Sequence, residues 1–512
     1  MRTIQRAASL VLGILLAPGC SAQSPAAAQV APAPSAAPPV TQTTPPQPAP
    51  APPPDAALPP EIEAYRPAVI ALLKEGLAHG QAYDKLASLC RTAPHRLSGS
   101  PGAAAAVEWA RQRMLDDGLD NVRLLPCTVP HWERGSVAEL RVLEPEAAAG
   151  ERLTILALGG SVATPPEGLT ADVLQVRSWE ELDQLGDAAR GKFVFYNRPM
   201  DPTLFEYGAA YGGAVDQRGR GGVEAAKRGG VGAIVRTMTT RLDDVPHTGA
   251  MRWTAEGPNV PGVAVSTQGA ERLAALLAQG PVKVHLQLDS HWLPDAPSAD
   301  VIGEITGSEK PDEVVVLGGH LDCWDVGQGA NDDGGGVCQA IEALRLLRAL
   351  DLHPRRTVRC VAFMNEENGG RGAQAYLDSV RDELDGHVLA IESDGGVGTP
   401  RGFGATVVPE ALAALRSIAT LLEPAGCGEM REGGSGADIE GLQSAGGVPV
   451  MAFRADTQHY FDLHHSERDT LDMVWPREIN LGAAAMAAMA YVVADMESPL
   501  PRSAPAPAST GH

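Results

Sequence analysis

The sequence is poor in aromatic residues, in basic residues and in closely spaced cysteines, and each shortage excludes a class of protein. Aromatic residues make up only 4% of the 512 residues, so the hydrophobic cores must rest on Leu, Val and Ala. The 63 acidic residues outnumber the 41 basic ones, and the formal net charge of −22 argues against nucleic acid or an anionic membrane surface as a partner. The seven cysteines form no CxxC pair, which excludes zinc-finger and thioredoxin-like proteins.

The N-terminal part of the sequence has the composition of a segment that exports and tethers a protein. Two arginines precede the apolar run Ala7–Ala17, which is too short to span a bilayer, so residues 1–22 predict an export signal. A loose lipobox ends at Cys20 and would leave a membrane tether through that lipidated cysteine, but the sequence up to Ala22 also suits ordinary signal peptidase. We therefore expect either a periplasmic lipoprotein of the outer membrane or a secreted protein. Residues 23–60 are rich in Pro, Ala, Gln and Thr and predict a disordered tether.

The rest of the sequence alternates between two patterns, and its length exceeds one ordinary core. Helix and strand patterns alternate in residues 61–130 and again in residues 294–503, which predicts a discontinuous α/β domain. Between them, residues 131–293 are dominated by short strands and turns, which predicts an inserted, mostly β module. The Pro- and Ala-rich tail, residues 504–512, is expected to be disordered.

The stretch Val314–Gly336 places metal-ligand residue types where a strand gives way to a helix. It opens with the buried-strand pattern Val314–Leu317 and leads into the helical pattern Val337–Leu350. His320 and Asp332 lie between the two, among glycines. Functional sites of open α/β sheets form at this position, outside the carboxyl ends of the strands.

Further ligand-type residues follow other predicted strands. Glu366 and Glu367 follow one of them, Asp394 follows another, and His465 lies nearer the C-terminus. Two imidazoles and three carboxylates suit Zn²⁺ or a related divalent ion. Five ligands are too many for one catalytic zinc but suit two ions about 3.5–4 Å apart that share a carboxylate, which would leave Glu366 as a general base. The candidate metal ligands are His320, Asp332, Glu367, Asp394 and His465.

Each of these residues also has an ordinary structural explanation. A single His or Asp after a strand is commonly a cap or turn residue, and Asp332 and Asp333 could simply cap the following helix. The run Gly334–Gly336 could form a phosphate-binding turn, but no Lys or Arg follows at P-loop spacing. Taken together, these structural explanations are weak, because they require separate loops to place residues of metal-ligand type at one sheet edge by chance.

Motifs around these residues, and others spread along the chain, match one enzyme family. Those at the candidate site are HLDCWD, GANDDGGG, NEENGG, ESD and HHSERDT. Those elsewhere are HRLSGS, PHWERG, TPPEGLTADV, ARGKFVFYN, PHTGAMR and YVVADMESPLPRS. Together they resemble the carboxypeptidase Q family of co-catalytic zinc exopeptidases over roughly residues 61–503. The resemblance implies a phosphorylase/hydrolase-like α/β domain with a mixed central sheet and helices on both faces, and an inserted protease-associated domain at residues 131–293.

The resemblance also implies a role for each candidate residue. Two zinc ions would be bound, with Asp332 as the bridge, one by His320 and Asp394 and the other by Glu367 and His465. The resemblance also implies that Glu366 is the general base and that the carboxylate of Asp322 orients His320. It further implies a cis peptide bond between Asp332 and Asp333. His464 stands at a position where some relatives carry Tyr. It either polarises the scissile carbonyl or stabilises the oxyanion, or it is a packing or surface histidine.

The expected protein is therefore an exported di-zinc peptidase that cleaves dipeptides or short peptides with free termini. Its nucleophile would be a metal-activated water, and Glu366 would take the proton of that water. The resemblance further suggests a homodimer. Two alternatives stay open: an aminopeptidase of the same clan, which would use the same residues, and a non-enzymatic binding protein that keeps the fold.

Overall fold

The computed structural model describes residues 58–253, 257 and 259–502. The predicted export signal, the candidate lipid-bearing Cys20, most of the tether and the tail from residue 504 lie outside the described residues. The first helix, α1 (Pro60–Glu63), begins at the predicted end of the tether. Within the described part of the chain, no helix is both long enough and apolar enough to cross a membrane.

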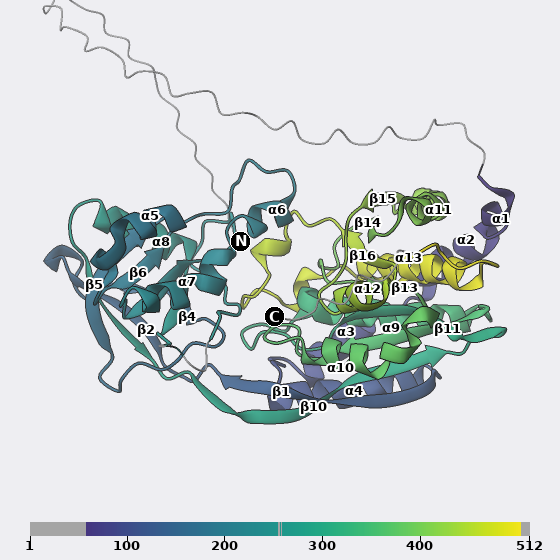
Figure 1. Cartoon of the computed structure of the whole chain (residues 1–512), viewed down its shortest axis with the longest axis horizontal. Coiled ribbons are helices and arrows are strands. Elements are labelled where there is room, and N and C mark those ends of the chain that lie inside the picture. Colours follow the sequence, from purple (N-terminus) through teal and green to yellow (C-terminus); the bar gives the residue numbers. More distant parts are fainter. Residues whose placement is uncertain (1–57, 254–256, 258, 503–512) are drawn as a thin grey trace, which may run out of the picture. The chain divides into compact units, whose positions relative to one another are not determined.

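Eight strands from distant parts of the sequence form one mixed sheet, as predicted (Figure 1). Its centre is parallel: β12, β11, β13 and β16 run in the same direction. At one edge β10 pairs antiparallel with β12 and with β1, and at the other β14 pairs antiparallel with β16. In order across the sheet, the strands are β1 (Asp120–Glu133), β10 (His291–Ile305), β12 (Arg356–Phe363), β11 (Lys310–His320), β13 (His387–Glu392), β16 (Val450–Ala455), β14 (Pro400–Thr406) and β15 (Glu429–Glu432).

Helices cover both faces of this sheet, because successive residues of a strand point to opposite sides. Val315 and Leu317 of β11 belong to a large core shared with seven α-helices of the described residues, whereas Val314 and Val316 belong to a smaller core shared with two others. The helices of the large core are α1, α2 (Arg66–His79), α3 (Ala82–Thr92), α4 (Pro101–Asp116), α9 (Gly335–Ala349), α11 (Pro409–Ala419) and α13 (Pro476–Asp495). Those of the smaller core are α10 (Arg371–Ser379) and α12 (Glu440–Gly446).

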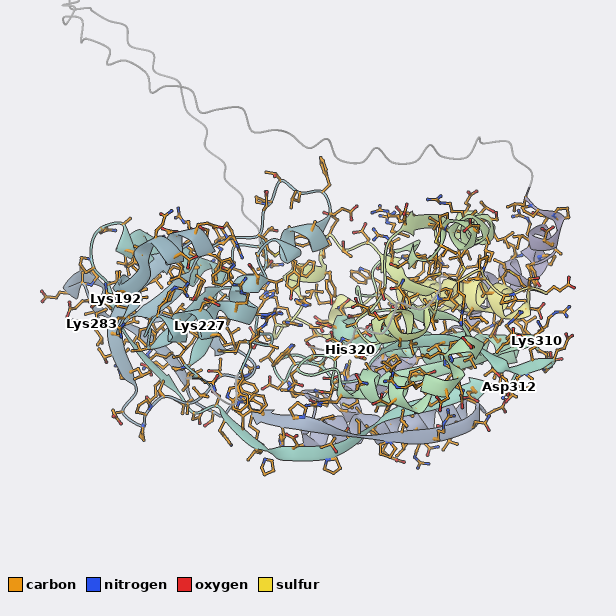
Figure 2. All side chains as sticks on the ribbon, viewed as in Figure 1. Lys192, Lys227, Lys283, Lys310, Asp312 and His320 are labelled. Carbon is orange, nitrogen blue, oxygen red and sulfur yellow. The ribbon has the colours of Figure 1, made fainter. Side chains whose placement is uncertain are left out.

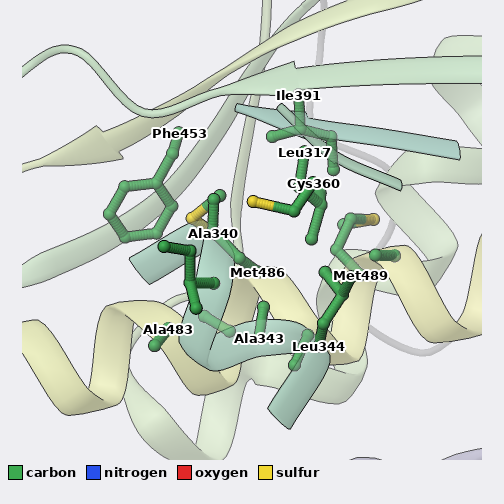
Figure 3. Packing of buried hydrophobic residues seen from close by; sticks show 14 of the residues in the cluster. Leu317, Ala340, Ala343, Leu344, Cys360, Ile391, Phe453, Ala483, Met486 and Met489 are labelled. Carbon is green, nitrogen blue, oxygen red and sulfur yellow. The ribbon is translucent and has the colours of Figure 1, made fainter. Parts of the chain in front are cut away.

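Small and aliphatic side chains fill the large core, as the scarcity of aromatic residues requires. Three neighbouring strands contribute Leu317, Cys360 and Ile391, and the helices α9 and α13 pack against them with alanine, leucine and methionine (Figure 3). The alanines let helices approach closely, and methionine fills irregular gaps. The core thereby fixes the three strands whose carboxyl ends carry the candidate ligands.

A second eight-stranded sheet lies wholly within residues 131–293, the predicted insertion. The chain enters it after β1 and leaves it into β10, so the long β1–β10 pair connects the two sheets (Figure 1). In order, its strands are β3 (Arg152–Leu153), β2 (Ala138–Glu144), β9 (Lys283–Leu288), β5 (Leu169–Val176), β6 (Phe193–Tyr196), β7 (Gly232–Arg236), β8 (Gly262–Val265) and β4 (Ile155–Ala157).

Four α-helices accompany the strands in the described part of this region, and sequence patterns indicated two of them, near residues 179–186 and 267–278. The four are α5 (Trp179–Leu185), α6 (Tyr207–Gly212), α7 (Asp216–Lys227) and α8 (Thr267–Leu277). Sequence patterns did not indicate α7, whose three glycines weaken helix propensity. Tertiary packing overrides that weakness: Gly221 lies against the ring of Tyr196, and Gly222 lies against Met251.

Candidate metal centre

The candidate ligands come from the carboxyl ends of adjacent parallel strands. His320 is the last residue of β11 and is buried (Figure 2). Glu367 follows β12, and Asp394 follows β13, the strands on either side of β11. Asp332 lies in the turn Ala330–Gly334 that leads into α9, and the loop after β16 supplies His465. The predicted convergence at one sheet edge is therefore present.

Asp332 lies between the two imidazoles. Its Oδ1 is 3.2 Å from Nε2 of His320, and its Oδ2 is 3.2 Å from Nε2 of His465. The same nitrogen of His320 lies 3.4 Å from Oδ1 of Asp394, and that of His465 lies 3.0 Å from Oε2 of Glu367. The two oxygens of Asp332 thus face different imidazoles, and the nitrogen of each of these two imidazoles also faces one further carboxylate.

The chemistry of this group fits divalent cations. Glu367 is 7% exposed, and its Oε1 has no hydrogen-bond partner among the described residues. Burial raises the pKa of Glu366 to about 8, and the neighbouring carboxylates of Asp394 and Glu367 contribute to this shift. The imidazole of His320 acts in the opposite direction. Crowding and burial favour the protonated form of such carboxyl groups, and a bound divalent cation would favour their ionised form instead. Imidazole and carboxylate donors are the set that zinc prefers in catalytic sites.

The carboxylate of Asp322 has a different partner from the one expected. Nδ1 of His320 lies 3.1 Å from the backbone oxygen of Asp322 and 3.8 Å from its carboxylate, so the backbone carbonyl accepts the Nδ1 proton. Oδ1 of Asp322 instead accepts the N–H groups of Asn365 and Glu366, at 2.8 and 3.1 Å. Asp322 therefore fixes both the imidazole and the backbone of Glu366, the first through its carbonyl and the second through its side chain.

Two buried aspartates support the turn at Asp332, and sequence patterns did not assign them this role. Asp469 accepts the N–H groups of Asn331 and Asp332 at 2.7 and 3.1 Å, on different oxygens. Asp333 accepts the N–H of His320 at 3.0 Å, and the Asp332–Asp333 peptide bond is cis, as the resemblance implied. Both aspartates accept hydrogen bonds from backbone groups, and a backbone group does not reveal its partner in the sequence. The position of Asp469 within the motif HHSERDT was the sequence feature that could have indicated its role.

His464 is not a surface histidine. It is 7% exposed and its ring stacks on that of His465, with centroids 3.5 Å apart. Its Nε2 lies 3.6 Å from Oδ2 of Asp332, and its Nδ1 has no hydrogen-bond partner in the described part of the chain. Burial and the neighbouring His465 hold the pKa of His464 well below its usual range, so the imidazole is neutral beside the carboxylates.

The second sheet also reaches this centre, which sequence patterns did not indicate. The backbone N–H of Thr248 donates to the carbonyl of His465 at 2.8 Å. Nη1 of Arg218, on α7, lies 3.3 Å from Nδ1 of the same imidazole. Arg134 forms an ion pair with Asp325, in the loop after β11. Residues 131–293 therefore contact the loops that carry the candidate ligands.

Comparisons with known proteins agree with this geometry. The model of peptidase family M28 matches residues 300–492. Carboxypeptidase Q from Bos taurus is 39% identical over 437 residues, which are 85% of this chain and 90% of the relative, and that from Homo sapiens gives the same values. The crystal structure of a peptidase M28 precursor from Shewanella amazonensis superposes with a TM-score of 0.82 at 33% identity, over 87% of this chain and all of the other.

A zinc aminopeptidase from Bacillus subtilis superposes with a TM-score of 0.59 over 80% of this chain and 94% of the other. At 18% identity this likeness shows the fold alone. The stronger matches cover 85% and 87% of this chain. The chain belongs to peptidase family M28, and the prediction of a zinc-dependent peptidase related to carboxypeptidase Q is confirmed.

Proposed function

We propose that this peptidase uses two zinc ions to cleave dipeptides or short peptides with free termini. The observation that carries the proposal is the position of Asp332, which presents one oxygen to His320 and the other to His465. His320, Asp332 and Asp394 would hold one ion, and Asp332, Glu367 and His465 the other. Zinc bound there would polarise the scissile carbonyl and lower the pKa of the attacking water.

Glu366 would act as the general base. It is the carboxylate of the cluster that the two ligand sets leave spare, and its Oε2 lies 4.0 Å from Nε2 of His320. Its backbone is held by Oδ1 of Asp322, which limits the movement of the side chain. Glu366 would take a proton from the attacking water at Oε2 and pass it to the leaving amine. His464, neutral and beside Asp332, would donate from Nε2 to the oxyanion.

Residues 131–293 would form an inserted protease-associated domain between the two parts of the catalytic domain, residues 61–130 and 294–503. The second sheet lies within those limits, and its Arg218 and Thr248 approach His465. A domain at this position would wall the cleft and limit the length of the peptide. Export, with or without a lipid on Cys20, and a homodimer are further proposals that rest on the sequence and the family resemblance.

Elemental analysis of the purified protein, together with hydrolysis of a dipeptide panel, tests the metal proposal. We expect two zinc ions per chain and cleavage that a chelator abolishes and zinc restores. One ion per chain would contradict the bridging role of Asp332. Cleavage that continues unchanged in the presence of the chelator would contradict metal catalysis as a whole.

The general base is tested by Glu366→Gln, which keeps the size of the side chain. We expect kcat to fall by about 10²- to 10⁴-fold with the zinc content unchanged. Full activity in this variant with zinc bound would contradict the role of Glu366.

Comparison of free dipeptides with N-blocked and C-amidated analogues separates a dipeptidase or carboxypeptidase from the aminopeptidase alternative.

A further inference from the structure

A cavity of about 210 Å³ opens beside the metal centre, and it contains a second acidic group. Asp394, a candidate zinc ligand, lies on its wall, and so does Glu392, two residues earlier at the end of β13. Ser435 and Gly436, which belong to the glycine-rich loop Gly433–Gly436, also line it. A substrate residue next to the scissile bond would therefore meet the carboxylate of Glu392.

The carboxylate of Glu392 is only half satisfied. The residue is 1% exposed, and its Oε2 accepts the N–H groups of Asp438 and Ile439 at 3.1 and 3.2 Å. Its Oε1 has no hydrogen-bond partner among the residues that the structure describes. The loop wraps the carboxylate closely: a Cβ on Gly436 would lie 2.0 Å from Cδ of Glu392. The glycine thus leaves the space that this carboxylate occupies.

Asp438 adds a second buried carboxylate behind the first. It is 3% exposed, its backbone N–H bonds to Glu392, and neither of its carboxylate oxygens has a partner within the described ranges. Three buried carboxylate oxygens are therefore left without a donor. Burying such groups is unfavourable unless they are paired, so they are expected where a ligand supplies the missing donors.

The basic residue on the cavity wall does not meet this need. Nη2 of Arg454 lies 3.6 Å from Oε2 of Glu206, a residue with a 60% exposed side chain. Glu206 in turn pairs with Arg431. The basic side chain is thus directed to acidic groups at the outer part of the cavity, and the inner carboxylates stay without a cation.

We propose that Glu392, supported by Asp438, binds a primary ammonium group of the substrate. This inference rests on the proposed peptidase function and adds a specificity site to it. An ammonium group is a compact charge with three donors, and in this cavity it would meet the unpartnered Oε1 of Glu392. Asp438 does not line the cavity, but its backbone N–H bonds to Glu392, so its carboxylate would add negative charge close to the ammonium group. In a peptide the group comes either from the free α-amino terminus or from a lysine side chain, and both sources share this chemistry.

The test compares substrates that differ only in the ammonium group, on the zinc-loaded full-length enzyme. Ala-Leu is compared with propionyl-Leu, which lacks the α-amino group. Nα-acetyl-Lys-Leu is compared with Nα-acetyl-norleucyl-Leu, which lacks the side-chain amine. We expect the wild-type kcat/KM to favour the amine-bearing member of one pair by about 10- to 100-fold, the value of a charged hydrogen bond. The favoured pair identifies the source of the ammonium group.

The variants Glu392→Gln and Asp438→Asn locate the site. Each keeps the size of its side chain and should reduce the preference at least tenfold, mainly through KM, while the zinc content stays the same. The matched control is Asp300→Asn in β10, because Asp300 is also a buried carboxylate with one unpartnered oxygen. Asp300 neither lines the cavity nor bonds to Glu392, since its Oδ1 accepts the N–H of Met364. This control should keep the wild-type preference.

Two results would overturn the ammonium site and leave the peptidase intact. One is equal wild-type kcat/KM within both substrate pairs, a result that needs no variant to fold. The other is a Glu392→Gln enzyme that binds zinc and keeps the full preference. Failure of the proposed function has a different signature, since the wild-type protein would then show no chelator-sensitive cleavage of Ala-Leu at all.

Discussion

The carboxylate of Asp469 holds the backbone of Asp332 in place, accepting its N–H at 3.1 Å through Oδ2. Its other oxygen accepts the N–H groups of Ala330 and Asn331, at 3.1 and 2.7 Å. A single buried side chain therefore fixes three consecutive peptide groups of the turn that presents the proposed bridging ligand. Supporting contacts of this kind tune metal affinity without touching the metal.

The first prediction follows from this contact. Asp469→Asn replaces one acceptor oxygen by a donor that faces a backbone N–H, so the turn should loosen and zinc affinity should fall by about 10-fold or more. Competition with a chelator measures the affinity. Asp472→Asn is the control, because Asp472 is exposed in the same loop and its carboxylate accepts a hydrogen bond from the hydroxyl of Thr470. Unchanged zinc affinity in Asp469→Asn would contradict the supporting role.

The second prediction separates the bridging ligand from a terminal one. Asp332 faces both imidazoles, whereas Asp394 faces His320 alone. Asp332→Asn should therefore weaken both zinc sites, and Asp394→Asn should empty one of them and leave the other occupied. Elemental analysis after dialysis against metal-free buffer gives the stoichiometry. Identical zinc loss in the two variants would mean that Asp332 does not bridge.

The third prediction concerns two glycines of α7. A Cβ at Gly219 meets no atom within 4 Å, whereas a Cβ at Gly221 would lie 2.9 Å from Cε2 of Tyr196. Gly219→Ala should raise the free energy of unfolding by about 0.5–1 kcal/mol through lower entropy of the unfolded chain. Gly221→Ala should lower it by about 1–3 kcal/mol through overpacking. Urea unfolding of the two variants provides the comparison; the same sign for both would contradict the packing of α7.

The fourth prediction is a pH dependence of stability that comes from His387. This imidazole is buried: its Nδ1 donates to the carbonyl of Glu383, and its Nε2 accepts from the hydroxyl of Tyr376, both at 3.1 Å. Burial lowers its pKa to about 4, against an ordinary value of 6.5. Between these values the unfolded chain binds the proton and the folded one does not, so stability rises with pH in that window and is lost as pH falls through it.

We therefore expect the wild-type free energy of unfolding to fall by up to about 1.4 kcal/mol per pH unit, from this group, as the pH decreases from 6 to 4.5. His387→Asn removes the titrating group and keeps a donor near the carbonyl of Glu383. Its pH slope should be smaller than that of the wild type by up to this amount. Equal slopes would show that His387 does not titrate in this window.

The elements that position the site were predictable from the sequence, and some of their surroundings were not. The apolar β-branched run of β11 and the Ala- and Met-rich pattern of α13 have periodicities that buried strands and helices impose. Sequence patterns missed several elements, among them the strands β5 and β14 and the helices α6, α7 and α12. In α7 the glycines lower local helix propensity, and only the contacts of Gly221 and Gly222 with Tyr196 and Met251 explain why the helix forms there.

The sequence by itself determined the type of chemistry, because ligand-type side chains follow strand patterns that must end at one edge of a parallel sheet. Tertiary structure alone decided how these side chains are supported and what surrounds them. Asp469 and Asp322 act on backbone N–H groups, Arg218 arrives from another sheet, and Glu392 and Asp438 become neighbours only through a loop. Contacts between residues far apart in sequence, especially those to backbone groups, leave no local pattern, so folding has to bring them together before they can be recognised.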